Sequence, residues 1–260
     1  LKERGHYRTP PEIRPLASSR FRLLASCKFH ALNIWSLYRG ARLAKKGRFD
    51  ADTWSAMAFD TLQFVERCGS RILLTGYGNV TEIEEPVIYV GNHMSLLETF
   101  VLPAFVPEGG RLSYVAKESL LHYPLFGPII RTTSPITVGR ENARQDLRRV
   151  LEDGADRLQN GRSVVLFPQA TRSTTFSERR FNSLGARLAE RTDTMIVPLA
   201  LRTDFLGNGR LIKDFGPVHN GRPVCFSFGP PVTRGTAKER HQAVVDFIRQ
   251  QLTEWGVPCE

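Results

Sequence analysis

The sequence predicts an α/β fold in which helices flank a central, mostly parallel sheet and an N-terminal amphipathic two-helix hairpin precedes it. Short apolar runs rich in valine and isoleucine recur from residue 70 onward, and helical stretches separate several of them. Such runs are typical of central strands covered on both faces. With 260 residues, of which 41% are hydrophobic and 24% charged, the chain can bury a sizeable core.

The part of the chain before residue 70 divides into an arm and a pair of helices. Residues 1–15 contain three prolines, several charges and little periodicity, which indicates an extended arm. Residues 16–69 carry apolar side chains at helical spacing in two stretches with a short connection. Asp52 or Thr53 is suited to cap the second stretch and Gly69 to end it, so we expect a helical hairpin here.

Two interpretations of this hairpin remain open. Its helices either pack on the main domain, or they form a membrane-docking element whose basic rim meets anionic lipid while Trp and Tyr lie at headgroup level. The best candidate for a membrane span is FHALNIWSLY (29–38), bounded by Lys28 and Arg39. It is much shorter than the ~20 apolar residues that a spanning helix needs.

Residues 70–260 make up the expected α/β domain. The apolar runs that predict its strands are RILLTGYG, PVIYVGNH, RLSYVAK, SPITVGR, SVVLFPQ, TMIVPLAL and PVCFSFGPPV. The intervening stretches that predict helices are 95–105, 118–130, 141–160 and 177–191.

The charge balance and the cysteines limit the classes of function. The chain has 36 Lys and Arg against 26 Asp and Glu, a net charge of +10, which favours contact with nucleic acid, an anionic membrane surface or phosphorylated substrates. The basic residues are dispersed, without zinc-finger spacing or an RNP-like aromatic run, so we expect no nucleic-acid partner. The cysteines lie far apart without a C-x-x-C pair, which favours free thiols in a reducing compartment over disulfides or a zinc site. They are Cys27, Cys68, Cys225 and Cys259.

The stretch GNHMSLLET (91–99) follows the expected buried strand PVIYV and contains His93 and Glu98. Because α/β proteins place their sites at the carboxyl ends of strands, His93 is expected at a rim facing a cleft. The segment SLLE is also a capping box, in which Ser95 caps a helix and Glu98 reaches back to a backbone N–H. Glu98 is therefore either a helix cap or the partner of a catalytic histidine, and one carboxylate rarely does both.

Two further strand ends carry cationic side chains. SVVLFPQATRST (163–174) is a strand that runs into a Pro-containing turn before Arg172, and ITVGRENARQDL (136–147) places Arg140 at a strand end just before a helix. Arginines at strand ends together with helix N-termini are suited to binding a phosphate or another anion.

The segments NHMSLLE, VGR, FPQATRS and IVPLAL resemble, in order and approximate spacing, the four motifs of the glycerolipid acyltransferase family, the lysophosphatidic acid acyltransferase or PlsC type. That family shows NH-x4-D, a motif ending in Arg, FPEGTRS and V-I-P-V. The resemblance covers about residues 70–235, and the two-helix unit also resembles the family's membrane-docking hairpin. It implies an O-acyltransferase in which His93 is the general base and Glu98, in place of the usual Asp, orients the imidazole.

By the same resemblance, the reaction needs no metal or cofactor, and acyl-CoA or acyl carrier protein is the acyl-donor substrate. The chain departs from the family at Gln169-Ala170, where the motif has Glu-Gly, and at Asn182, where a lysine is usual. Lys117 is either a phosphate contact or a solvated lysine. The implied substrate- and phosphate-binding residues are Arg140, Gln169, Thr171, Arg172 and Lys117.

Three functions remain compatible with the sequence. The first is acylation of a 1-acylglycerol-3-phosphate-like lysophospholipid by a peripheral enzyme on the cytoplasmic face of an anionic membrane. The second changes the acceptor to another lyso-lipid, such as one containing an amino acid, and is motivated by the departures at residues 169, 170 and 182. The third is a lipid-binding relative without catalytic turnover.

Overall fold

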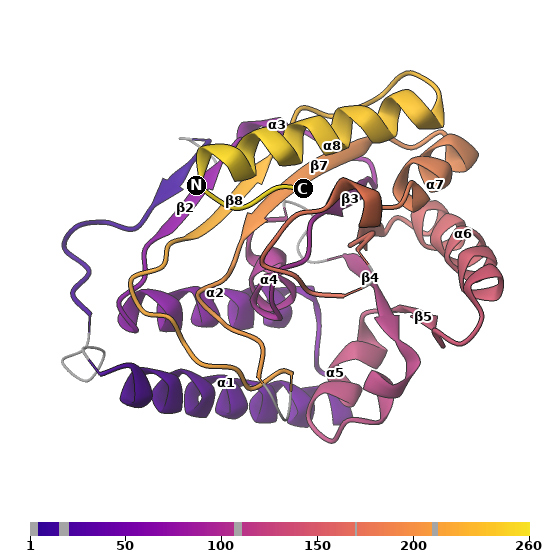
Figure 1. Cartoon of the computed structure of the whole chain (residues 1–260). Coiled ribbons are helices and arrows are strands. Elements are labelled where there is room, and N and C mark those ends of the chain that lie inside the picture. Colours follow the sequence, from indigo (N-terminus) through magenta and orange to yellow (C-terminus); the bar gives the residue numbers. More distant parts are fainter. Residues whose placement is uncertain (1–4, 16–20, 107–110, 170, 210–212) are drawn as a thin grey trace.

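A sheet of eight strands occupies the centre of the molecule in the computed structural model, which describes residues 5–15, 21–106, 111–169, 171–209 and 213–260 (Figure 1). The strand order is β1-β2-β8-β7-β3-β6-β4-β5. The pairs β1–β2 and β7–β8 are antiparallel, and all other neighbours are parallel. The prediction of a mostly parallel sheet is therefore confirmed. The strands are β1 (Tyr7–Arg8), β2 (Ile72–Thr75), β3 (Ile88–Gly91), β4 (Leu112–Lys117), β5 (Ile136–Val138), β6 (Ser163–Leu166), β7 (Ile196–Arg202) and β8 (Val224–Phe228).

Helices cover both faces of the sheet, and each face has its own hydrophobic core. Phe29 and Leu62 belong to the core on the side of α1, α2 and α4, whereas Leu188 and Ile248 belong to the core on the side of α6, α7 and α8. The helices are α1 (Arg22–Lys45), α2 (Ala51–Arg67), α3 (Gly78–Thr81), α4 (Leu97–Val101), α5 (Phe126–Thr132), α6 (Ala143–Gln159), α7 (Leu184–Thr192) and α8 (Ala237–Glu254). Short 3-10 turns add η2 (Leu102–Ala104), η3 (Glu118–His122) and η4 (Glu178–Arg180).

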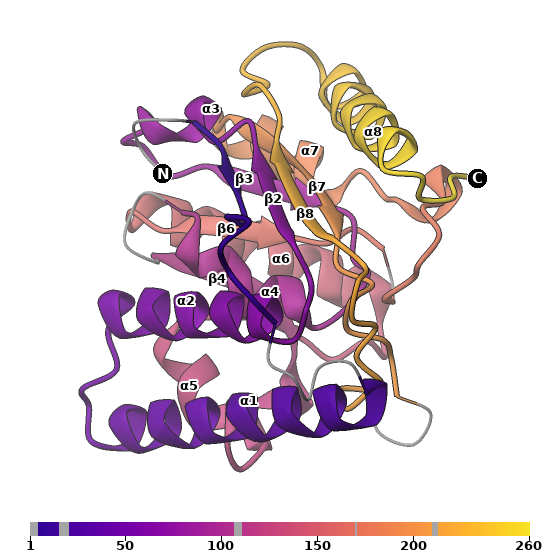
Figure 2. The same ribbon diagram turned by 90° about the vertical axis from the view of Figure 1, so that its left-hand side faces the viewer.

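The two N-terminal helices run side by side as a hairpin, with α1 on the outer side of α2 (Figure 2). Asp50, rather than Asp52 or Thr53, caps α2 by accepting a hydrogen bond from the backbone N–H of Thr53. A Cβ on Gly40 would lie 2.7 Å from the sulfur of Met57, so glycine allows α1 to approach α2 closely. No helix in the described part of the chain is both long and apolar enough to cross a membrane.

The helical stretches predicted between the strands are present, but two of them are interrupted. Residues 118–130 form η3 and then α5, because Tyr123 takes an extended backbone before Pro124, a position that disfavours helix. Residues 177–191 likewise form η4 and then α7. The stretch 141–160 corresponds to the uninterrupted helix α6.

Within the N-terminal arm, Tyr7 and Arg8 form an edge strand, which the sequence analysis did not predict. Strand β1 pairs with β2, and the hydroxyls of Tyr7 and Thr9 each donate to the buried carboxylate of Glu66 at 2.7 Å. Helix α8 was also missed, although the capping box formed by Thr236 and Glu239 marks its start.

Candidate active site

The backbone around the end of β3 places His93 at the carboxyl edge of the sheet. A Cβ on Gly91 would lie 2.8 Å from the carbonyl oxygen of Leu199, so glycine permits the close pairing of β3 with β7 at this point. The side-chain amide of Asn92 then donates to the Leu201 carbonyl and accepts from the Leu201 N–H, both at 2.8 Å. These two bonds fix the chain just before His93, at the edge where α/β folds place their sites.

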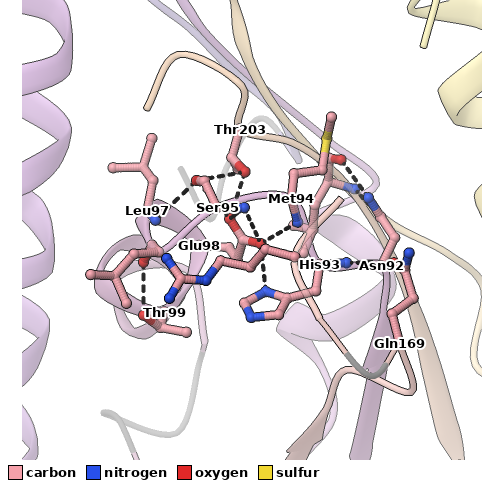
Figure 3. A network of polar contacts seen from close by, with 12 residues as sticks. Asn92, His93, Met94, Ser95, Leu97, Glu98, Thr99, Gln169 and Thr203 are labelled. Carbon is pink, nitrogen blue, oxygen red and sulfur yellow. Dashed lines mark hydrogen bonds and ion pairs between the residues drawn. The ribbon is translucent and has the colours of Figure 1, made fainter. Parts of the chain in front are cut away.

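Glu98 lies next to the His93 imidazole, on the side of Nδ1, and is completely buried (Figure 3). Its Oε1 accepts from His93 Nδ1 at 2.8 Å and from the Met94 N–H at 2.7 Å. Its Oε2 accepts from the hydroxyls of Ser95 at 3.1 Å and Thr203 at 2.5 Å, and the Ser95 N–H lies 3.0 and 3.1 Å from the two oxygens. One carboxylate therefore orients the imidazole and also satisfies backbone donors at the start of α4.

The capping box at this position is only half formed. Glu98 accepts from the Ser95 N–H as a capping box requires, but the Ser95 hydroxyl oxygen accepts from the N–H of Leu97 at 3.1 Å instead of that of Glu98. The same hydroxyl lies 3.0 Å from Thr203 Oγ1. Ser95 thus joins the helix start to the network around Glu98.

The surroundings of Glu98 keep it ionised. Burial by itself raises the pKa of this carboxyl, but the hydrogen bond and charge of His93, followed by the bonds from Thr203 and Ser95, more than offset burial, so the pKa lies below its ordinary value. A carboxylate next to His93 Nδ1 requires the proton on that nitrogen. In the neutral imidazole, Nε2 is then the nitrogen that can accept a proton.

The ring and backbone of His93 are held by the loop that follows β6. Phe167 stacks on the imidazole with ring centroids 4.6 Å apart and planes 6° from parallel. The side-chain oxygen of Gln169 accepts from the His93 N–H at 2.8 Å, and the Ser173 N–H donates to the His93 carbonyl at 2.9 Å. Gln169 is buried and serves here as an acceptor behind His93, a role for which no negative charge is needed.

His93 lines a cavity of about 220 Å³ whose lining includes both cationic and apolar side chains. Lys117, Arg140, Thr171 and Arg172, all predicted from the sequence, line this same cavity, and Lys213 joins them. The large apolar side chains of the lining come mainly from the N-terminal hairpin, α4 and α5. They are Leu37, Trp54, Met57, Leu96, Phe100, Leu120, Phe126, Ile129 and Ile130.

Arg140, one of the cationic residues that line the cavity, has an unusual backbone conformation. Its φ of +66° lies in the left-handed region, which side chains other than glycine seldom adopt. The carboxylate of Asp146 in the first turn of α6 accepts from the N–H groups of Gly139 at 3.0 Å and Arg140 at 2.9 Å. Asp146 therefore holds the turn that presents Arg140 to the cavity.

The remaining departures from the family motifs lie in different places. Asn182 donates to the Pro168 carbonyl at 2.7 Å and accepts from the Leu184 N–H at 3.0 Å, so it ties the loop after β6 to the start of α7. Both polar atoms of the Asn182 amide are thus engaged by backbone groups. Ala170 lies outside the described residues.

A family model described as Acyltransferase matches residues 71–202 of this sequence. The chain belongs to the acyltransferase family. Among its relatives, the 1-acyl-sn-glycerol-3-phosphate acyltransferase of Pseudomonas aeruginosa is 29% identical over 153 residues, covering 59% of this chain and 57% of that protein. The enzyme of the same name from Cocos nucifera is 28% identical over 137 residues, covering 50% and 44%. The chain thus aligns with about half the length of these curated family members.

A solved structure shows that the fold is shared within the family. The 1-acyl-sn-glycerophosphate acyltransferase PlsC from Thermotoga maritima matches with a TM-score of 0.70 and 18% sequence identity, covering 91% of this chain and 97% of that one. The eight-stranded sheet and the helices on its two faces are therefore a PlsC-like α/β architecture.

The sequence analysis missed several residues that shape the site. Thr203 lies two residues after the end of IVPLAL and Phe167 lies inside FPQATRS, so both are inside or next to motifs that the sequence analysis identified. Asp146 occupies the first turn of an expected helix, where an acidic side chain is common. Lys213 belongs to the long β7–β8 connection, and its sequence surroundings carry no comparable signal.

Proposed function

We propose that this chain transfers a fatty acyl group from acyl-CoA or acyl carrier protein to the free hydroxyl of a 1-acylglycerol-3-phosphate-like lysophospholipid. The observation that carries the proposal is the position of His93, which lines one cavity together with several cationic and many apolar side chains. A lysophospholipid has the matching parts, since an anionic headgroup, a hydroxyl and an aliphatic chain follow one another along the molecule. The names of the relatives agree with this acceptor.

In the proposed reaction, His93 Nε2 takes the proton of the acceptor hydroxyl as its oxygen attacks the thioester carbonyl. The carbon–sulfur bond then breaks, and the imidazolium returns the proton to the departing thiolate. Glu98 stabilises the imidazolium and fixes its orientation, and general-base catalysis of this kind contributes roughly 10²–10⁴-fold to a rate. Lys117, Arg140 and Arg172 supply positive charge for the phosphate of the acceptor or donor.

Acyl transfer by wild type and His93→Ala to a panel of lysolipids tests this proposal. We expect the substitution to lower kcat by at least about 10²-fold while leaving lysolipid binding in place. Transfer that survives His93→Ala would remove His93 from the role of base. If wild type binds lysolipids but transfers no acyl group to any of them, the chain is a lipid-binding relative.

We further propose that α1 docks the protein peripherally on the cytoplasmic face of an anionic membrane. Large apolar side chains are exposed along and just before this helix, and basic side chains lie over two of them: Arg39 over Trp35 at 4.6 Å and Arg42 over Tyr38 at 5.8 Å. Aromatic rings next to arginines suit the boundary between headgroups and acyl chains. The exposed apolar set is Phe21, Leu23, Leu24, Ile34, Trp35 and Tyr38.

Co-sedimentation with vesicles tests the docking. We expect wild type to bind vesicles containing an anionic phospholipid and to bind neutral vesicles less, because each basic residue near an anionic surface contributes about 1 kcal/mol. Leu23→Ser with Trp35→Ser should reduce binding to both kinds of vesicle. Phe59→Ser, which changes an exposed aromatic residue of α2, is the matched control. Equal binding by all variants would contradict docking through α1.

A further inference from the structure

The connection between β7 and β8 links the candidate site to helix α1. Thr203, which follows β7, donates to Glu98, and from there the chain runs to α1 and returns to β8 (Figures 1 and 2). We call the described residues 203–209 and 213–223 of this connection the β7–β8 loop. The His30 ring donates to the Gly216 carbonyl at 2.8 Å, and the Val218 N–H donates to the Ser26 hydroxyl oxygen at 2.9 Å. These contacts anchor the loop to α1.

Just before its contacts with α1, the β7–β8 loop carries Lys213 and Asp214, two adjacent side chains of opposite charge. Each of them contacts a residue that lines the cavity. Lys213 lines the cavity, with its ammonium 3.2 Å from the hydroxyl of Thr171. Asp214 accepts a hydrogen bond from Arg172 Nη2 at 2.6 Å. A longer contact of 3.3 Å joins Arg172 Nη1 to the side chain of Asn208. The arginine implied as a phosphate ligand therefore already has a carboxylate partner.

This ion pair is sheltered but still reachable by solvent. The side chain of Arg172 is 17% exposed and that of Asp214 is 25% exposed. Hydrogen bonds between ionised groups are among the stronger polar contacts, and carboxylate and phosphate oxygens compete for the same guanidinium N–H groups. A phosphate at Arg172 must therefore displace Asp214 or share the guanidinium with it, and Asp214 also lowers the positive potential around Arg172.

We propose that the β7–β8 loop determines which lysolipid headgroup is accepted, because Lys213 adds a cation to the lining of the cavity while Asp214 competes with the headgroup phosphate for Arg172. This inference rests on the proposed function. The two residues act in opposite directions on one quantity, the preference for a phosphate monoester over a zwitterionic phosphodiester. Asp214 weakens that preference and Lys213 strengthens it.

The test compares 1-acylglycerol-3-phosphate with the phosphocholine lysolipid of the same acyl chain, both in neutral detergent micelles. We expect Asp214→Asn to lower KM for the monoester about three- to tenfold and to change KM for the phosphocholine lipid less than about twofold. Lys213→Gln should raise KM for the monoester by a similar factor. The double variant should return close to wild type, because the two changes oppose each other in charge.

Two controls separate this effect from general damage to the loop. Asp204→Asn removes a carboxylate of the same loop that pairs with Arg202 and Arg222, and it should leave the preference unchanged. In an Arg172→Ala background, Asp214→Asn should change the preference much less than in wild type, because the competition for Arg172 is removed and only the charge of Asp214 remains to act.

An unchanged ratio of KM values in Asp214→Asn would overturn the proposal, and so would a rise of KM for the monoester, which would show that Asp214 only holds Arg172 in place. The ratio of equilibrium binding constants for the two lipids gives the same test without turnover. A wild type that binds both lipids but transfers nothing therefore contradicts the proposed function and still tests this inference.

Discussion

Two carboxylates beside the cavity, Glu98 and Asp214, each pair with a side chain implied in the reaction, but they are held very differently. Glu98 is fully buried and accepts hydrogen bonds from one imidazole, two hydroxyls and two backbone N–H groups. Asp214 is 25% exposed and accepts from Arg172 at a loop position. The first is a fixed part of its network, whereas the second can be exchanged for another anion.

The difference shows what makes a carboxylate a permanent partner. Taking a charge out of water is costly, so a buried carboxylate persists only where several donors compensate for its lost hydration. The donors around Glu98 come from its own segment and from Thr203, which follows β7. Asp214 keeps part of its hydration and needs no such set of donors. A phosphate can therefore displace Asp214 from Arg172 at a smaller cost in free energy than any anion could displace Glu98.

The largest expected effect is that of Glu98→Gln on kcat. The amide keeps the size of the side chain, and the hydroxyls of Ser95 and Thr203 can rotate to accept from its NH2 group, so we expect stability to fall by only about 1–2 kcal/mol. The variant loses the charge that stabilises the His93 imidazolium, so kcat should fall about 10²–10⁴-fold with every acceptor. Urea denaturation and steady-state kinetics measure the two effects.

Glu98→Gln would then differ from Asp214→Asn in both the kinetic constant and the substrates affected, because Asp214→Asn is expected to change KM for only one class of acceptor. If Glu98→Gln lost stability while kcat stayed unchanged, Glu98 would be a helix cap and the two carboxylates would not differ in the way described. Glu98→Asp is the conservative control, because it retains the charge and shortens the side chain by one methylene.

The lowered pKa of Glu98 also affects the stability of the protein at low pH. The pKa of Glu98 is lower in the folded protein than its ordinary value of 4.5, so the stability it contributes is fully present above about pH 4.5 and is lost as pH falls through the folded-state pKa. The difference in unfolding free energy between wild type and Glu98→Gln should therefore narrow as pH is lowered below 4.5. A difference that stays constant with pH would show that the contacts of Glu98 do not depend on its ionisation.

The fold and the gathering of strand-end residues could be predicted from the sequence because both follow from local patterns. Parallel strands bring their carboxyl ends to one edge, so His93, Arg140 and Arg172 could be expected near one another before any contact was known. The half-buried hairpin likewise follows from helical spacing. The prediction of one helix over 118–130 was wrong at the break before Pro124, although this break also follows from a local rule, because the residue before a proline disfavours helix.

The partners that distinguish the two carboxylates could not be predicted in this way. Thr203 is 105 residues from Glu98 and Asp214 is 42 residues from Arg172, and neither distance produces a recognisable spacing in the sequence. Thr203 donates to Oε2 of Glu98 while Oε1 accepts from His93 Nδ1, so the network that supports the dual role of Glu98 includes a residue far away in the sequence. Gln169 and Asn182 show the same limit, because their backbone contacts across the fold decide what their substitution means.

The smallest expected effect concerns the hydroxyl of Tyr114. Unlike the carboxylate of Glu98, it is a buried polar group without a hydrogen-bond partner among the described residues. Tyr114 belongs to β4 and is among the residues that line the cavity. Burial, followed by the charge of Glu98, raises the pKa of this hydroxyl, so it stays protonated. Tyr114→Phe removes only the unpartnered oxygen, and we expect stability to stay constant or to rise by up to about 1 kcal/mol.

Thermal unfolding measures this change, which corresponds to an upward shift in Tm of about 2–4 °C per kcal/mol for a chain of this size. Tyr7→Phe is the matched control, because its hydroxyl donates to the buried carboxylate of Glu66 at 2.7 Å and its loss should destabilise by about 1.5–3 kcal/mol. A destabilisation of similar size in Tyr114→Phe would mean that this hydroxyl is bonded in solution. A fall in kcat without any loss of Tm would instead show that the Tyr114 hydroxyl donates a hydrogen bond to the bound substrate. A neutral donor and the ionised Glu98 would then both take part in the reaction.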